Sequence, residues 1–344
     1  MPLHPFLNRV VERANLTALE ARSAMGAILA GEATPPQIAA FLVALKMKGE
    51  TVDELVGFAR AMRRVAAPVV ARLDQPLLDT CGTGGDGSAT FNISTLAAIV
   101  AAGAGVHVAK HGNRSISSQC GSADLMEGLG VNLSLNADNI GRSIREVGIG
   151  FLFAPAIHTA MKHAQPVRVD LRMRTVFNLL GPLTNPAGAT AQLVGAPSDE
   201  TAELMAGALA ALGLERGLVV HGSDGLDEIT TTGSTRAFEI RAGHCERRLL
   251  RPEDLGIERA KPSDLKGGDR ECNVRIAQEI LGGAKGPRRD AVLVNAAAAL
   301  YVAGRATDLG QGVRVAADAI DSGAARKKLK ELADFSQMAT AAQG

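Results

Sequence analysis

The sequence predicts an α/β protein with two parts, a small N-terminal α-helical domain and a large α/β domain around a central, mostly parallel sheet. Two observations lead to this prediction. Helical periodicity fills residues 1–72, and after Pro76 short apolar segments alternate with helical patterns. Alternation of this kind is typical of a parallel sheet covered by helices. Of the 344 residues, 46% are hydrophobic but only 3% aromatic, so small aliphatic side chains must fill the core, which suits close helix–sheet packing.

Two capping-box patterns predict helix starts in the N-terminal part, T-P-P-Q from Thr34 and T-V-D-E from Thr51. After each start, apolar residues recur with helical spacing and share one face, at 38, 41, 42 and 45 and at 55, 58, 59 and 62. Val52 and Val56 add apolar side chains outside the second stripe. Either an interface between two copies or a wide core face explains them.

After Pro76, the pattern predicts strands at 77–78, 106–109, 150–153 and 218–220, with helices starting at Ser94 and Ala123. The stretch 154–186 interrupts this alternation with helical pattern and a polar turn. Ligands of parallel sheets bind at the carboxyl ends of the strands, so the loops after the predicted strands are the candidate sites.

The first such loop reads D-T-C-G-T-G-G-D-G from Asp79 and leads into N-I-S-T from Asn92. A strand, a glycine-rich turn and a helix start together present backbone N–H groups to one anion. The loop matches neither the Walker motif nor G-x-G-x-x-G, which argues against a P-loop nucleotidase or a Rossmann dehydrogenase. A tight connection that binds nothing stays possible for this loop alone.

Two further loops add complementary chemistry. K-H-G-N-R-S from Lys110 concentrates cations, an amide and hydroxyls after a strand, as an anionic ligand requires. H-G-S-D-G-L-D-E from His221 ends in two adjacent carboxylates, which suit Mg²⁺ bridged to ligand phosphates, although an acidic surface turn has the same composition. Together the three loops indicate a site for a pyrophosphate leaving group.

These segments, in this order, resemble the anthranilate phosphoribosyltransferase family. The resemblance also includes K-M-K-G-E-T from Lys46, R-T-V-F-N-L-L-G-P-L-T-N-P from Arg174 and R-D-A-V-L-V-N-A-A-A-A-L from Arg289, and so covers essentially the whole chain. It implies interleaved domains. Residues 1–72, with about 160–188 packing back on them, would form the helical domain, and residues 73–159 and 189–344 the α/β domain.

The resemblance also implies an activity, the Mg²⁺-dependent transfer of the phosphoribosyl group of 5-phosphoribosyl 1-pyrophosphate to anthranilate in tryptophan biosynthesis, by an oxocarbenium-like displacement. Asp227, Glu228 and Ser94 would hold Mg²⁺, as two ions, and Gly82, Asn113 and Arg168 would face anthranilate. For His111 we expect an orienting role rather than that of an obligatory base. The implied phosphoribosyl pyrophosphate contacts are Gly82, Gly85, Asp86, Thr90, Asn92, Ile93, Ser94, Thr95, Lys110, His111, Gly112, Asn113, Arg114, Ser115, Ile116, Ser117, Ser118 and Ser122.

Composition restricts partners and location. The net charge of +1 gives no broad basic surface for nucleic acid, and the longest apolar stretch, 96–109, is too short for a membrane span. The four cysteines lack metal or disulfide spacing, and we expect a cytoplasmic enzyme. The family resemblance implies a homodimer formed through the helical domain. Two alternatives are a pyrimidine nucleoside phosphorylase, which the N-I-S-T, K-H-G-N-R-S and Asp-Glu clusters disfavour, and a non-catalytic relative that binds nucleic acid, which the near-neutral charge disfavours.

Overall fold

The structure, a computed structural model, describes residues 3–115 and 119–341. The predicted contacts Ile116, Ser117 and Ser118 therefore lie outside the described residues. The N-terminal part is helical, as predicted, and both predicted capping boxes start helices. Its helices are α1 (His4–Val11), α2 (Ala18–Leu29), α3 (Pro35–Lys48) and α4 (Val52–Val65).

The predicted apolar faces of α3 and α4 form the core of this helical part. Phe41 and Phe58 are fully buried, and their rings meet edge to face with centroids 6.2 Å apart. Val56 is buried, and Val52 lies against Gly207 of α11 (Asp199–Ala211) in the same chain. The second apolar side of α4 is thus covered by the chain's own α/β part.

The α/β part contains one seven-stranded sheet in the order β3-β2-β1-β4-β5-β6-β7. The first five strands are parallel, and β6 and β7 extend the sheet as an antiparallel hairpin beside β5. This confirms the predicted mostly parallel sheet. The strands are β1 (Leu77–Gly82), β2 (His107–Gly112), β3 (Ile149–Phe153), β4 (Ala191–Gly195), β5 (Arg216–Gly222), β6 (Thr235–Arg241) and β7 (His244–Leu250).

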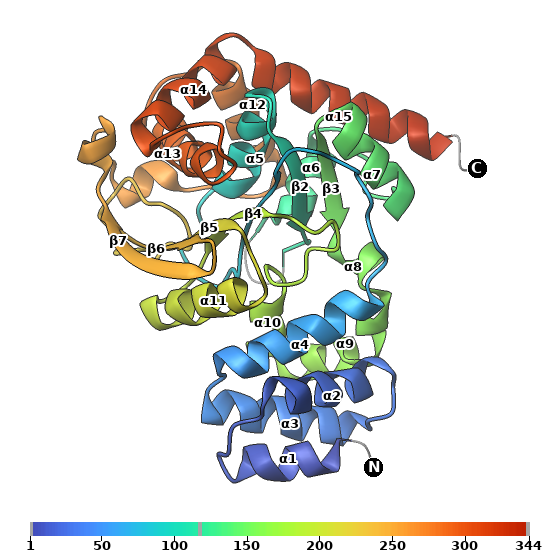
Figure 1. Ribbon diagram of the computed structural model, residues 1–344. Coiled ribbons are helices and arrows are strands. Elements are labelled where there is room, and N and C mark those ends of the chain that lie inside the picture. Colours follow the sequence, from blue (N-terminus) through green and yellow to red (C-terminus); the bar gives the residue numbers. More distant parts are fainter. Residues whose placement is uncertain (1–2, 116–118, 342–344) are drawn as a thin grey trace.

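Helices cover both faces of the sheet (Figure 1). The central helix α5 contacts β1 and β2 and is itself covered by α13, α14 and α15, while α11 covers β5 and β6 from the other face. The bounds are α5 (Ile93–Gly103), α6 (Ser122–Gly128), α7 (Ala137–Glu146), α12 (Arg270–Leu281), α13 (Pro287–Val302), α14 (Leu309–Asp321), α15 (Ala324–Ala341) and the short helices η2 (Pro252–Leu255) and η3 (Pro262–Leu265).

The chain between β3 and β4, residues 154–190, returns to the helical part, and we call it the return segment. It contains α8 (Ala154–Ile157), η1 (Thr159–His163), α9 (Gln165–Leu171) and α10 (Phe177–Leu180). η1 packs on α2, α9 on α3 and α10 on α4, and Val176 and Phe177 are buried in the same core as the N-terminal helices. Figure 1 shows α9 and α10 beside α4, from which they are distant in sequence.

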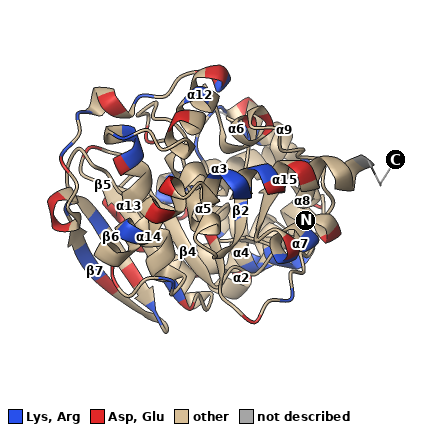
Figure 2. Ribbon diagram, turned by 90° about the horizontal axis from the view of Figure 1, so that it is seen from above, with Lys and Arg blue, Asp and Glu red and all other residues tan. Residues whose placement is uncertain are grey.

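The distribution of charged residues and the state of the cysteines are consistent with the composition of the chain. Acidic and basic residues lie interspersed over the elements seen in Figure 2. All four cysteines are free thiols. Among the described helices, none is both long and apolar enough to cross a membrane.

Candidate active site

The topology places the candidate loops at one point of the sheet. From β1 the chain proceeds through α5 to β2 on one side, whereas β4 pairs with β1 on the other side. Connections therefore diverge at the carboxyl ends of β1 and β4, and such a switch point opens a crevice for ligands. The glycine-rich loop follows β1 and the acidic pair follows β5, whereas K-H-G-N-R-S begins in the last three residues of β2, which runs beyond the predicted strand 106–109, and continues into the loop after it.

The acidic pair links the glycine-rich loop to the start of α5. Asp227 Oδ2 accepts a hydrogen bond from Gly84 N at 2.9 Å, and Glu228 Oε1 accepts one from Ser94 N at 3.1 Å. Each carboxylate thus accepts from a backbone N–H group that lies more than 130 residues away in the sequence. The predicted metal ligands Ser94, Asp227 and Glu228 lie together.

Glycine is required where Asp227 lies against the strands. A Cβ on Gly82 would lie 2.6 Å from Asp227 Oδ2, and one on Gly195 only 1.6 Å from the Asp227 backbone oxygen. Real Cβ atoms do not approach so closely, so any side chain at either position displaces the acidic pair. Asn295 of α13 fixes the backbone of Ile229, the residue after the acidic pair. It accepts a hydrogen bond from Ile229 N at 3.0 Å and donates one to Ile229 O at 2.9 Å.

The electrostatics of the pair favour a cation. Burial raises the pKa of Glu228 to about 8, and the charge of Asp227 adds to the shift. Burial and the charge of Asp86 raise the pKa of Asp227 to about 6, against the opposing effect of the Gly84 N–H and Arg174. Two neighbouring carboxylates that resist ionisation in this way gain from a divalent ion, which neutralises both.

The residues present fit Mg²⁺. Among the described residues, no three His, Cys, Asp or Glu side chains converge as a complete ligand set. Mg²⁺ does not need one, because it keeps several waters and binds through one or two carboxylates together with substrate phosphates. A pair of carboxylates beside backbone N–H groups suits that ion better than a metal that demands an all-protein cage.

The end of β2 and the loop after it contribute a buried lysine and a set of polar side chains. Lys110 is 2% exposed, and its Nζ donates to Thr80 O beneath the glycine-rich loop. Asn113 and Ser122 hold each other through Asn113 N and O and the Ser122 hydroxyl, at 3.2 and 3.3 Å. The Arg114 guanidinium pairs with Asp124 and Glu127, so in this structure it is held by α6.

The other predicted residues around the first loop divide into polar contacts and core positions. Asp86 accepts from Ser88, whose hydroxyl lies 3.4 Å from that of Thr90. Asn92 Nδ2 donates to Cys120 O at 3.1 Å and so joins the first loop to the second. Ile93 and Thr95 are buried, backbone included, and Ile93 N donates to Phe91 O at 2.8 Å. Ser115 donates its backbone N–H to Asp124.

Two buried residues that the sequence reasoning did not single out connect β1, β2 and the return segment. Asp79 is fully buried and accepts from His111 N at 3.1 Å and from Asn185 Nδ2 at 2.8 Å. Asn185 Nδ2 also donates to Ala109 O at 2.8 Å. Burial raises the pKa of Asp79, while the Asn185 hydrogen bond and the charge of Lys110 oppose the rise. The sequence signal for Asp79 was a carboxylate directly after the apolar residues of a predicted strand.

His111 lies against a second histidine. Its ring meets that of His158 edge to face, with centroids 5.2 Å apart, and both residues are less than 10% exposed. Burial lowers the pKa of His111 to about 4 and that of His158 to about 3. Within the described residues, the Nε2 atoms of both rings are buried without a hydrogen-bond partner. Both rings are therefore neutral at pH 7.

The predicted anthranilate ligand Arg168 comes from the return segment. It lies on α9 with its guanidinium 5.2 Å from the centre of the Phe177 ring, and its Nη1 donates to Gln165 at 3.1 Å. Burial lowers its pKa. Stacking on an aromatic ring fixes the plane of the guanidinium, which favours a planar, bidentate partner such as a carboxylate.

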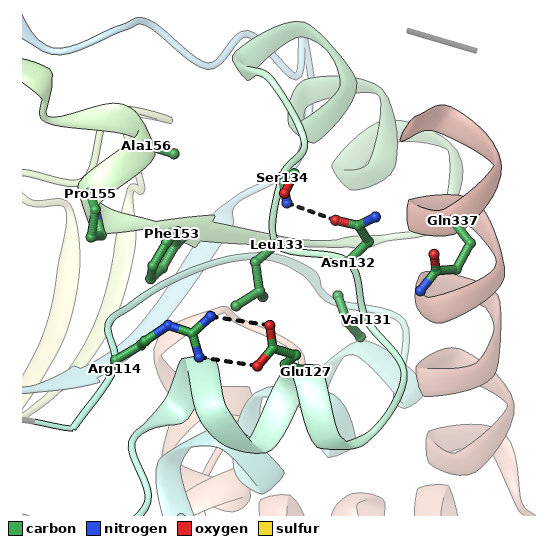
Figure 3. A pocket seen from close by; sticks show the side chains of 10 residues that line it. All are labelled: Arg114, Glu127, Val131, Asn132, Leu133, Ser134, Phe153, Pro155, Ala156 and Gln337. Atoms are coloured by element: carbon green, nitrogen blue, oxygen red, sulfur yellow. Dashed lines mark hydrogen bonds and ion pairs between the residues drawn. The ribbon is translucent and has the colours of Figure 1, made fainter. Parts of the chain in front are cut away.

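A cavity of about 690 Å³ opens on the other side of the second loop (Figure 3). The ten residues that line it include Arg114, Phe153 and Gln337 but neither the glycine-rich loop nor the acidic pair. Arg114 and Glu127 face each other across its wall (Figure 3). The cavity therefore adjoins the candidate site and does not coincide with it. The candidate site is therefore defined by the hydrogen bonds of Asp227 and Glu228 and not by this cavity.

Comparison with known proteins agrees with this arrangement. Residues 4–66 match the helical bundle domain of a glycosyl transferase family, and residues 74–326 match the α/β domain of a glycosyl transferase family. The chain is 67% identical over 336 residues to an anthranilate phosphoribosyltransferase of Solibacter usitatus, covering 97% of this chain and 99% of that protein.

Solved structures agree in fold. The crystal structure of anthranilate phosphoribosyltransferase from Thermus thermophilus matches with a TM-score of 0.92 at 46% identity, covering 98% of this chain and all of that one. The enzyme from Saccharomyces cerevisiae, solved in complex with phosphoribosyl pyrophosphate and Mg, matches with a TM-score of 0.90 at 28% identity over 98% of both chains. Another structure of the yeast enzyme contains 4-fluoroanthranilate.

Proposed function

Because the chain belongs to the anthranilate phosphoribosyltransferase family, we propose that it transfers the phosphoribosyl group of 5-phosphoribosyl 1-pyrophosphate to anthranilate, in tryptophan biosynthesis. The bond between C1 of the ribose and the pyrophosphate oxygen breaks, and the anthranilate nitrogen bonds to C1 and loses a proton. The products are N-(5-phosphoribosyl)anthranilate and pyrophosphate. One observation carries the proposal most directly: the carboxylates of Asp227 and Glu228 reach the backbone N–H groups of Gly84 and Ser94.

The phosphoribosyl pyrophosphate would lie across the first two loops. The glycine-rich loop offers backbone donors without Cβ atoms in the way, the start of α5 adds the backbone N–H groups of a helix N-terminus, and Lys110 supplies a buried ammonium group. Asp227, Glu228 and Ser94 would hold Mg²⁺, for which we propose two ions. The ion would neutralise charge that develops on the leaving pyrophosphate.

Anthranilate would lie beside Gly82 and Asn113, with Arg168 pairing to its carboxylate. An aromatic amine of low basicity is unprotonated at neutral pH, so its attack needs positioning more than a strong base. His111, whose pKa burial lowers to about 4, is a weak base and fits an orienting role. We propose a displacement in which positive charge builds on the ribose before the new bond is complete.

The domain division at 72/73, the membership of residues 160–188 in the helical domain and the dimer stay predictions. The packing of the return segment on α2, α3 and α4 supports this division of the chain. For the dimer, the N-terminal helices expose apolar side chains. Leu19 of α2 and Met47 of α3 are 71% and 70% exposed and are available to a second copy.

Loss of anthranilate fluorescence on mixing the protein with phosphoribosyl pyrophosphate and Mg²⁺ tests the proposed reaction. The substitution Asp227→Asn should lower the rate about 100-fold or more, because it removes charge where the developing anion is stabilised. The exposed Asp254→Asn is the matched control and should retain wild-type turnover. The proposal fails if the wild-type protein consumes no anthranilate, and phosphorolysis of thymidine or uridine by the same preparation would establish the nucleoside phosphorylase alternative.

A further inference from the structure

Arg174 joins the return segment to the glycine-rich loop. Its Nη2 donates to Thr83 O at 3.0 Å. The guanidinium also lies directly against the Cα of Gly85, since a Cβ built there would be 1.5 Å from Nη1 and 2.4 Å from Cζ. Gly85 has φ +84°, so the position excludes a side chain both by backbone conformation and by this contact. Only glycine at this position lets the loop and the guanidinium pack this closely.

The loop is held from two sides. Asp227 accepts from Gly84 N, and Arg174 donates to the carbonyl of the preceding residue, Thr83. Both hydrogen bonds meet the same peptide group, which joins Thr83 to Gly84, and the next residue, Gly85, lies against the guanidinium. Two side chains of opposite charge thus fix the direction of this peptide group, which belongs to the loop proposed to face the diphosphate.

Arg174 also places a positive charge beside the carboxylates of the site. The carboxylates of Asp86 and Asp227 both attract the Arg174 guanidinium. An arginine stays protonated in proteins, so it keeps a positive charge beside the acidic pair at every working pH. Without it, the carboxylates of the loop would face an incoming anion with less compensation.

The backbone around Arg174 is fixed by packing. Thr175, Val176 and Phe177, which follow it directly, are buried, and the last two belong to the apolar core that the N-terminal helices share with α11 and one face of the sheet. Thr175 N donates to Asn178 Oδ1 at 3.0 Å. The guanidinium thus reaches the glycine-rich loop from a backbone that is anchored in the core between the helical part and the sheet.

We propose that Arg174 is a positioning residue for phosphoribosyl pyrophosphate, acting through residues 83–85 of the glycine-rich loop. This inference rests on the proposed function. It predicts a selective effect: loss of the guanidinium weakens the phosphoribosyl pyrophosphate complex, whereas anthranilate, which would bind through other residues, is little affected.

Three variants test this. Arg174→Met keeps most of the side-chain length and removes the charge, Arg174→Lys keeps the charge without the planar donors, and Arg172→Met removes the same charge from an exposed neighbouring position. We expect Arg174→Met to raise the KM for phosphoribosyl pyrophosphate about 10- to 100-fold, the usual effect of losing a charged hydrogen bond. Its KM for anthranilate should change less than about twofold, and Arg174→Lys should lie between Arg174→Met and wild type. Arg172→Met should behave as wild type.

Calorimetric titration with phosphoribosyl pyrophosphate and Mg²⁺ gives a readout independent of turnover, and the Kd should rise with the KM. The inference is overturned if Arg174→Met binds phosphoribosyl pyrophosphate as tightly as wild type, or if both KM values rise together along with a lowered melting temperature. The outcomes separate the two proposals, because an inactive wild-type protein refutes the proposed function, whereas an active wild type with an unaffected Arg174→Met refutes only the role of Arg174.

Discussion

The two buried histidines make the stability of the fold depend on pH in a predictable window. An unfolded histidine binds a proton near its ordinary pKa of 6.5, whereas burial lowers the folded pKa of His111 to about 4 and that of His158 to about 3. Between these values the unfolded state binds more protons than the folded state. Protonation then favours unfolding, so the contribution of these two histidines to stability is complete above pH 6.5 and is lost as the pH drops toward 4.

The magnitude follows from the two pKa values. At about pH 5, roughly 30 protonated unfolded forms exist for each neutral one, while the folded ring stays almost entirely neutral, which costs about 2 kcal/mol of unfolding free energy per histidine. Because the rings lie 5.2 Å apart and repel each other when charged, protonating one does not ease protonation of the other in the folded state.

Urea unfolding followed by far-UV circular dichroism measures this effect, since the chain has no tryptophan and a single tyrosine to report by fluorescence. The substitution His158→Gln should reduce the loss of unfolding free energy between pH 7.5 and pH 5 by about 2 kcal/mol. Replacing the exposed His4 with Gln is the matched control and should leave the loss as in wild type. A loss in His158→Gln as large as in wild type would show that the buried ring does not carry the pH dependence.

Two further predictions concern the acidic pair and the assembly. Gly195→Ala places a Cβ 1.6 Å from Asp227 O, so we expect destabilisation of about 1 to 3 kcal/mol in thermal melts and a higher Mg²⁺ requirement. Gly26→Ala, in a helix with open space around the added Cβ, should be neutral or stabilising, and wild-type Mg²⁺ dependence in Gly195→Ala would contradict the packing argument. Sedimentation at micromolar concentration should show a dimer, and a species of monomer mass alone would reject it.

Local signals in the sequence were enough to predict much of the fold. The capping boxes at Thr34 and Thr51 fix helix starts through neighbouring residues, and the apolar faces that follow are buried as their spacing predicts. The three polar loops lie at the carboxyl edge of one sheet because consecutive parallel strands point the same way. The antiparallel hairpin of β6 and β7 was not predicted. Its outer strand is mostly exposed and lacks the apolar pattern that marks a buried strand.

Contacts between distant residues could not be predicted from local pattern. Gly84 and Asp227 are 143 residues apart, and Arg174 and Thr83 are 91 apart, so only the folded chain shows that they meet. The buried pair Asp79 and Asn185, 106 residues apart, is of the same kind. Each of these pairs contains a polar side chain next to buried apolar residues. That feature indicates that a partner exists but does not identify it.

The route of the chain explains why the return segment contributes to the site. After β3, at one edge of the sheet, the chain must reach β4 on the far side of β1, and it does so by way of the helical part. The connection therefore passes β1, where Arg174 meets the glycine-rich loop after the strand and Asn185 meets Asp79 within it. The residues next to Arg174 are buried in the core where the N-terminal helices, α11 and the sheet meet, so the position of the guanidinium depends on the packing between the two parts. We therefore expect substitutions in α9 or α10 that disturb this packing to weaken substrate binding as well as to lower stability.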